Sequence, residues 1–123
     1  MSVVPYTLVW YPEPARPIGL IVTWGPMGTS DTGLPLDLVG FADRSIQVEG
    51  TFGGATLELQ GSNDLTNFRV LHDPYSNPLD YLAARIDHLT EIPVLMRPAV
   101  LGGDGTTALN VTMYIRRTDR IVS

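Results

Sequence analysis

The chain has no cysteine and no lysine, and it has only two histidines among its 123 residues. Without cysteine it has no disulfide scaffold, no thiol nucleophile and no cysteine ligand for zinc. All eight of its basic residues are arginine, against thirteen acidic residues, and the formal net charge is −5. Because nucleic-acid-binding surfaces normally carry a basic patch, we expect no nucleic-acid partner.

Long apolar runs are also missing. The longest, Ile18 to Trp24, is far too short to span a bilayer. No charged segment followed by an apolar one resembles a secretory signal. We therefore expect no membrane partner and synthesis in the cytoplasm, with stability supplied by the core or by association with other chains.

Glycine and proline, in contrast, are plentiful and spread along the chain, at twelve and ten residues. This distribution favours many short strands and turns over a helical bundle. We predict an all-β, single-domain antiparallel β-sandwich or barrel of about seven or eight strands. Residues 1–17 are rich in proline and aromatic residues and are predicted to form an extended N-terminal arm. Within them, residues 6–11 read either as part of that arm or as an edge strand; residues 18–123 form the domain.

Alternation of apolar and polar residues marks the individual strands. Strands are predicted at 18–24, 36–38, 45–49, 56–60, 68–71, 94–101 and 109–116. The glycine-rich segments 50–54 and 102–105 read as hairpin turns, because glycine and Asp-Gly suit positive φ angles. Pro98 suggests that its strand lies at an edge or contains a bulge. Residues 79–89 are the one candidate for a short helix, with a bent strand as the alternative.

Candidate catalytic and metal-binding groups are few. His72 beside Asp73 offers half of a metal site or a general base, but neither His72 nor His88 has a third partner at a recognisable spacing. Asp64 fits a calcium loop only if a second acidic loop approaches, and it more simply stabilises its own turn. No nucleophile-elbow motif is present. We therefore predict no enzyme activity, no metal site and no cofactor.

Candidate partner-binding residues lie at the two ends of the chain. Large aromatic residues supply much of the energy at interface hot spots, which favours Trp10 and Tyr11, and Arg16 accompanies them. Arg116 and Arg117 form a small basic cluster that either contacts an acidic partner or is a solvated strand end. Trp24 closes a strong strand, so burial explains it better.

Several short motifs resemble a family of small virion structural proteins of tailed bacteriophages. In chain order they are VTWGPM at 22–27, FADRSIQV at 41–48, GTFGGA at 50–55, LQGSND at 59–64, MRP at 96–98 and GDGTT at 103–107. The resemblance covers about residues 21–117. One departure is Leu65, where the family's Ser-Asn-Asp turn usually continues with glycine.

This resemblance implies a structural protein of the virion and carries no catalytic residues with it. It favours a capsid decoration (cement) protein on the outer capsid surface, bound to the major capsid protein and to copies of itself as a homo-oligomer, for which we expect a trimer. One alternative is a tail, neck or baseplate component. Another is a carbohydrate-binding β-sandwich module, which would need an aromatic platform beside polar side chains.

Overall fold

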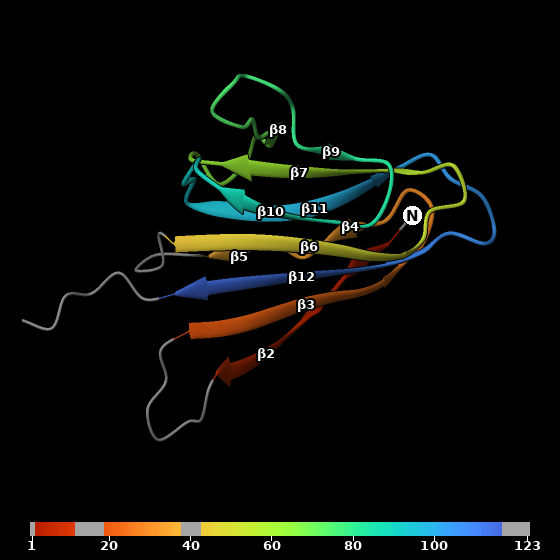
Figure 1. The fold of residues 1–123 in the computed structure, drawn as a ribbon, viewed down its shortest axis with the longest axis horizontal. Helices are drawn as coiled ribbons and strands as arrows, with labels where there is room; N and C mark the ends of the chain where they lie inside the picture. The colour runs from red at the N-terminus through yellow and green to blue at the C-terminus, as the bar shows by residue number, and fades with distance from the viewer. Residues whose placement is uncertain (1, 12–18, 38–42, 117–123) are drawn as a thin grey trace, which may run out of the picture.

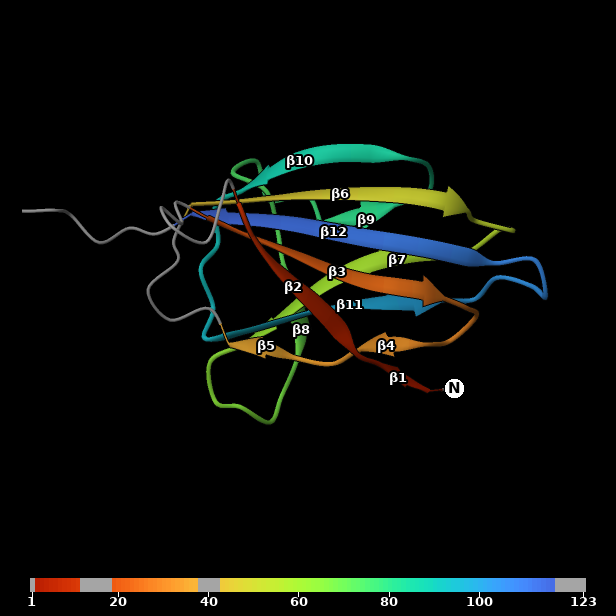
Figure 2. The same ribbon diagram turned by 90° about the horizontal axis from the view of Figure 1, so that it is seen from below.

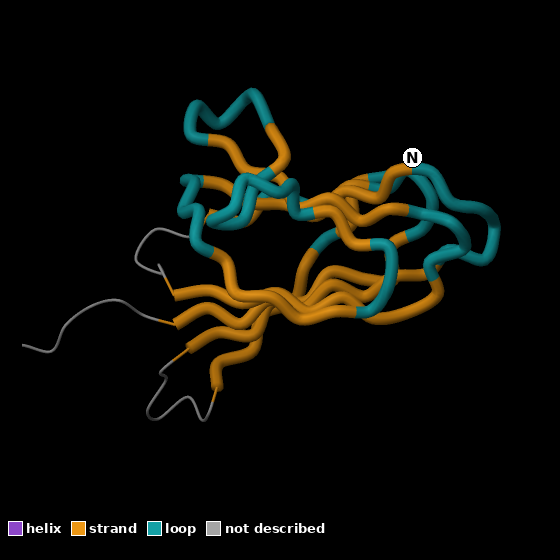
Figure 3. The backbone as a smooth tube through the Cα atoms, turned by 45° about the horizontal axis from the view of Figure 1, so that its top comes forward, coloured by secondary structure: helices purple, strands orange, loops and turns teal. Residues whose placement is uncertain are grey.

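Two β-sheets pack face to face and enclose one core (Figure 3). The structure is a computed structural model that describes residues 2–11, 19–37 and 43–116. Within these ranges it has twelve strands and no helix. The prediction of an all-β sandwich is therefore confirmed.

The seven-stranded sheet has the central order β1-β4-β11-β7-β8, with β5 beside β11 and β9 beside β7 (Figure 1). Its strands are β1 (Val3–Val4), β4 (Thr32–Gly33), β5 (Leu36–Asp37), β7 (Thr56–Ser62), β8 (Arg69–Val70), β9 (Asp80–Tyr81) and β11 (Leu95–Leu101). The five-stranded sheet has the order β10-β6-β12-β3-β2. Its strands are β2 (Tyr6–Tyr11), β3 (Gly19–Met27), β6 (Asp43–Thr51), β10 (Arg85–Leu89) and β12 (Ala108–Arg116). Pairing among these strands is antiparallel except between β1 and β4, which are parallel, so the sandwich is not purely antiparallel.

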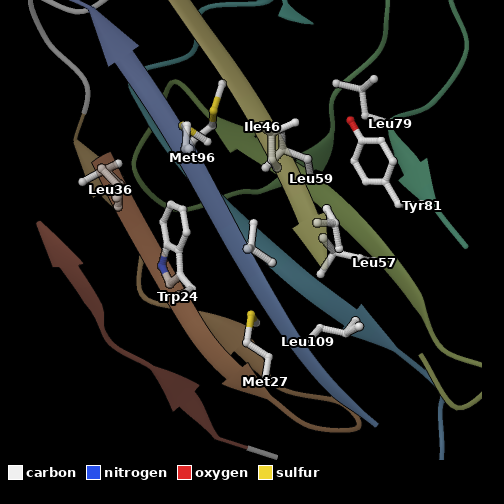
Figure 4. Packing of buried hydrophobic residues seen from close by; sticks show 14 of the residues in the cluster. Trp24, Met27, Leu36, Ile46, Leu57, Leu59, Leu79, Tyr81, Met96 and Leu109 are labelled. Carbon is white, nitrogen blue, oxygen red and sulfur yellow. The ribbon is translucent and has the colours of Figure 1, made fainter. Parts of the chain in front are cut away.

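The core is built from the alternating apolar positions that the sequence marks. Both sheets contribute, and the fully buried members include Ile46, Val48, Leu57, Leu59, Leu109, Val111, Met113 and Ile115 (Figure 4). Trp24 is also completely buried, as predicted. Its indole Nε1 donates a hydrogen bond to the carbonyl oxygen of Leu34 at 3.0 Å, and its ring meets Tyr6 edge-on with the centroids 5.8 Å apart. The polar atom of this buried side chain therefore has a partner, as burial requires.

The two glycine-rich segments are not hairpin turns, and that prediction was wrong. Residues 50–54 lead from β6 in one sheet to β7 in the other, and residues 102–105 lead from β11 to β12 in the opposite direction. The two connections lie against each other, since Thr107 Oγ1 donates to the carbonyl of Phe52 at 2.9 Å. Gly53 has a φ of 57° and no room for a side chain beside Asp104. The glycines thus allow close packing of two loops that cross between the sheets.

Pro98 does not lie at an edge, which corrects a second prediction. It sits in the interior strand β11, opposite Leu59 of β7. On its other side the neighbouring strand is interrupted, because β5 pairs with Leu95 and Met96 whereas β4 pairs with Ala99. Proline, which lacks an N–H, is accommodated at this interruption.

Residues 79–89 form no helix; they are strand β9, a bend and strand β10. Leu79, Tyr81 and Leu89 are buried, but Leu82 and Ile86 are 73% and 66% exposed. The prediction of a helix is therefore wrong, and the bent-strand alternative is correct only in that the segment is extended, because it forms two strands in place of one. The helical spacing was misleading because β9 and β10 belong to opposite sheets.

Within residues 2–11, two strands belong to the sandwich and do not form a separate arm. Val3–Val4 pair with β4, and Tyr6–Tyr11 pair along their whole length with β3 (Figure 2). Of the two interpretations of residues 6–11, the edge strand is the one observed. Residues 12–17 of the predicted arm lie outside the described residues.

Candidate functional site

Among the described residues, the longest run of consecutive exposed apolar side chains lies along edge strand β2. Leu8, Val9 and Tyr11 are each more than half exposed, and Trp10 is 40% exposed. The strand pairs with β3 on one side, and no described strand covers its other side. Its backbone is thus available to pair with a further strand, beside side chains that gain from burial.

The opposite edge of the same sheet differs in character. There β10 carries Arg85, Asp87 and His88, and Arg85 forms an ion pair with Asp87 at 3.1 Å. Charged residues on an edge strand discourage pairing with another chain. Strand β2 has no charged residue, so the two edges are unequal and β2 is the one suited to association.

The structure places three of the five predicted partner-binding residues. Trp10 and Tyr11 lie next to each other on β2, and Arg116 ends β12; Arg16 and Arg117 lie outside the described residues. Tyr11 and Arg116 lie at the same end of the five-stranded sheet, because both pair with Gly19, one from each side. Tyr11 and Arg116 therefore lie in one region of the surface, on either side of Gly19.

Arg116 is bound to an acidic residue of its own chain. Its Nε donates to Oδ2 of Asp43 at 2.9 Å, and its Nη2 donates to the same oxygen. On the other side, Nε2 of His88 lies 3.7 Å from Oδ1 of Asp43. The hydrogen bond from Arg116 is the main cause that holds the pKa of Asp43 below its ordinary value. This group joins strands β12, β6 and β10.

A tyrosine beside this ion pair escaped the sequence analysis. The ring of Tyr114 lies over Gly19 so closely that a Cβ at Gly19 would be 2.6 Å from the phenol oxygen. Tyr11 meets the same ring edge-on, with the centroids 6.4 Å apart. Together with Asp43, Ser45, His88 and Arg116, Tyr114 surrounds a shallow hollow of about 240 Å³. The only signal in the sequence was a glycine near the start of a predicted strand, and the side chain that fills the space beside it depends on the strand register.

The other candidate groups have structural roles. The carboxylate of Asp64 accepts hydrogen bonds from the backbone amides of Thr66 and Asn67 at 2.9 and 2.7 Å, which confirms the prediction that it stabilises a turn. The backbone N–H of His72 donates to Glu91. Among the described residues, no three His, Asp or Glu side chains gather as metal ligands would. Within those ranges there is also no helix long and apolar enough to cross a bilayer.

Comparisons with known proteins add little. No protein-family model and no curated protein matches the sequence. Among solved structures, the chain is similar to Peruvianin-I, a cysteine peptidase from Thevetia peruviana latex, with 17% identity and a TM-score of 0.49. The match covers 96% of this chain but only 66% of the peptidase. A similarity at this level carries no argument about activity.

Proposed function

We propose that this protein is a structural protein of a tailed-bacteriophage virion, and specifically a decoration protein that binds the outer surface of the capsid. The family resemblance of its motifs supports this role. The observation that carries the mode of action is the uncharged, apolar edge strand β2, with Leu8, Trp10 and Tyr11 exposed along it.

The mechanism is mechanical. A strand of a neighbouring subunit, from the major capsid protein or from a second copy of this chain, pairs with β2 and extends the five-stranded sheet. Pairing satisfies the backbone groups along the edge and removes the side chains of Leu8 and Trp10 from water. A rigid domain attached in this way links adjacent subunits and resists expansion of the shell.

Imaging of labelled particles tests this proposal. Phage carrying this protein with an electron-dense label at its C-terminus are expected to show label distributed over the capsid facets. Label confined to the tail or neck would contradict the decoration role and favour the tail-component alternative. Absence of label from purified particles would contradict a role in the virion altogether.

A further inference from the structure

The outer face of the five-stranded sheet carries the hollow beside Tyr114, and neither the edge pairing of β2 nor the core requires it. Tyr114, Ser45 and His88 lie directly opposite one another on β12, β6 and β10. Ser45 therefore forms the floor, and the two rings form the walls. Two strand spacings, about 10 Å, separate the backbones of the two strands that carry these rings.

One end of the hollow is closed by the Asp43–Arg116 ion pair. The side chains of Asp43 and Arg116 are 41% and 54% exposed, so both reach the solvent in the hollow. A carboxylate only accepts hydrogen bonds and a guanidinium only donates them. Side by side, the two groups match a ligand whose neighbouring groups can each donate and accept hydrogen bonds, as the vicinal hydroxyls of a sugar can. Because the two charges neutralise each other, the pair does not favour an anion.

The aromatic part of the site is held in place. Tyr114 packs on Gly19, where any side chain would displace it, and Tyr11 supports it from the edge strand. A fixed tyrosine ring offers an apolar surface with one polar end. The hollow, at about 240 Å³, is smaller than the roughly 300–1,000 Å³ typical of sites for drug-sized molecules. It fits a single small ring.

We infer that the hollow formed by Tyr114, Ser45, His88, Asp43 and Arg116 binds a neutral saccharide, one pyranose ring at a time. The apolar face of the sugar packs on Tyr114, and its hydroxyls bond to Asp43, Arg116 and Ser45. The platform that a carbohydrate-binding module requires is thus built from tyrosines and not from the tryptophans. The hollow is lined by residues of β6, β10 and β12, and β2 contributes only the supporting ring of Tyr11, so sugar binding does not require attachment to a capsid.

Titration of the full chain with glucose, galactose, mannose and N-acetylglucosamine, followed by NMR, tests the inference. At least one sugar is expected to shift the Tyr114 and His88 ring signals with a Kd on the order of 1 mM, since a small open site gives weak binding. If none of these sugars shifts those signals, the inference is wrong.

Variants locate the site. Ser45→Phe fills the floor of the hollow from the solvent side and is expected to abolish binding. Gly19→Ala displaces the Tyr114 ring without changing a polar group, and we expect it to weaken binding about tenfold. Glu49→Phe adds the same bulk on the same face of β6 outside the hollow and serves as the matched control. Equal sugar affinity in Ser45→Phe and the unmodified protein would overturn the inference, whereas Ser45→Phe is still expected to bind capsids.

Discussion

At the scale of single residues, three non-glycine residues among those described, Ser30, Leu65 and Ser76, have a positive backbone φ. Leu65 has a φ of 68° and is 62% exposed, directly after the carboxylate that stabilises its turn. This is the position at which the resembling family usually has glycine. The left-handed conformation costs an L-residue energy that glycine avoids, so the departure in sequence coincides with local strain in this structure.

Replacement of this leucine tests the strain. Leu65→Gly is expected to raise the free energy of unfolding by about 0.5–1 kcal/mol, because the relief of strain exceeds the added chain entropy. Leu65→Ala retains the strain and is the matched control, while Leu65→Val should lower the stability. Urea denaturation measures all three variants. A loss of stability in Leu65→Gly would show that the leucine makes contacts worth more than the strain.

Asp64 gives a prediction about pH. The backbone amide of Asn67 is the main cause that lowers the pKa of Asp64 below its ordinary value of 3.8. Since the folded state prefers the ionised carboxylate, its contribution is present above the pKa of the unfolded chain and is lost as the pH falls through the lower folded value. Asp64→Asn is therefore expected to be less stable than the unmodified protein at neutral pH.

The difference in stability between Asp64→Asn and the unmodified protein should become smaller as the pH falls below about 4. Thermal unfolding across a pH series measures it. A difference that stays constant down to strongly acid conditions would mean that the charge of Asp64 contributes nothing.

At the scale of strands, the sequence correctly predicted where most strands lie and which of their side chains face the core. It did not predict which strands pair with each other. Alternation placed Ile46, Val48, Leu57 and Leu59 in the core correctly, since facing depends only on period two. Glycine-rich segments that cross between sheets have the same composition as hairpin turns, so β6 and β7 were paired wrongly. The register between two strands depends on residues far apart in the sequence. For this reason the contacts of Asp43 with Arg116 and of Gly19 with Tyr114 were not predicted.

The interrupted neighbour of β11 gives a prediction at this scale. A Cβ at Gly33 would lie 2.6 Å from Cδ of Pro98 and 2.7 Å from Cδ1 of Trp24. Gly33→Ala is therefore expected to lower the free energy of unfolding by roughly 1–3 kcal/mol, as overpacking does. Gly105→Ala, where a Cβ has no atom within 4 Å, is the control and should change little. Chemical denaturation measures the stability of both variants. Equal stability would contradict the prediction and would mean that β4 shifts to accommodate the methyl group with no loss of free energy.

At the scale of the whole molecule, the five-stranded sheet has two unequal edges, β2 and β10, and its outer face carries the hollow beside Tyr114. Trp10 and Tyr11, which the sequence analysis predicts to bind a partner, are exposed on a strand of the domain and not on a separate arm. The five-stranded sheet can therefore grow at β2 without any rearrangement of the core. Our proposal that the domain attaches to a shell is based on this geometry together with the resemblance of its motifs.

Co-sedimentation of the purified protein with empty capsids tests this central proposal most directly. The unmodified protein is expected to sediment with capsids at a fixed stoichiometry. Leu8→Lys combined with Trp10→Ala, which adds a charge to the β2 edge and removes its largest side chain, should reduce binding by at least about tenfold. Ile86→Lys on the opposite edge, at a residue that is also exposed, is the control and should bind normally. Capsid binding that is unchanged by the β2 variant, or absent from the unmodified protein, would contradict the account.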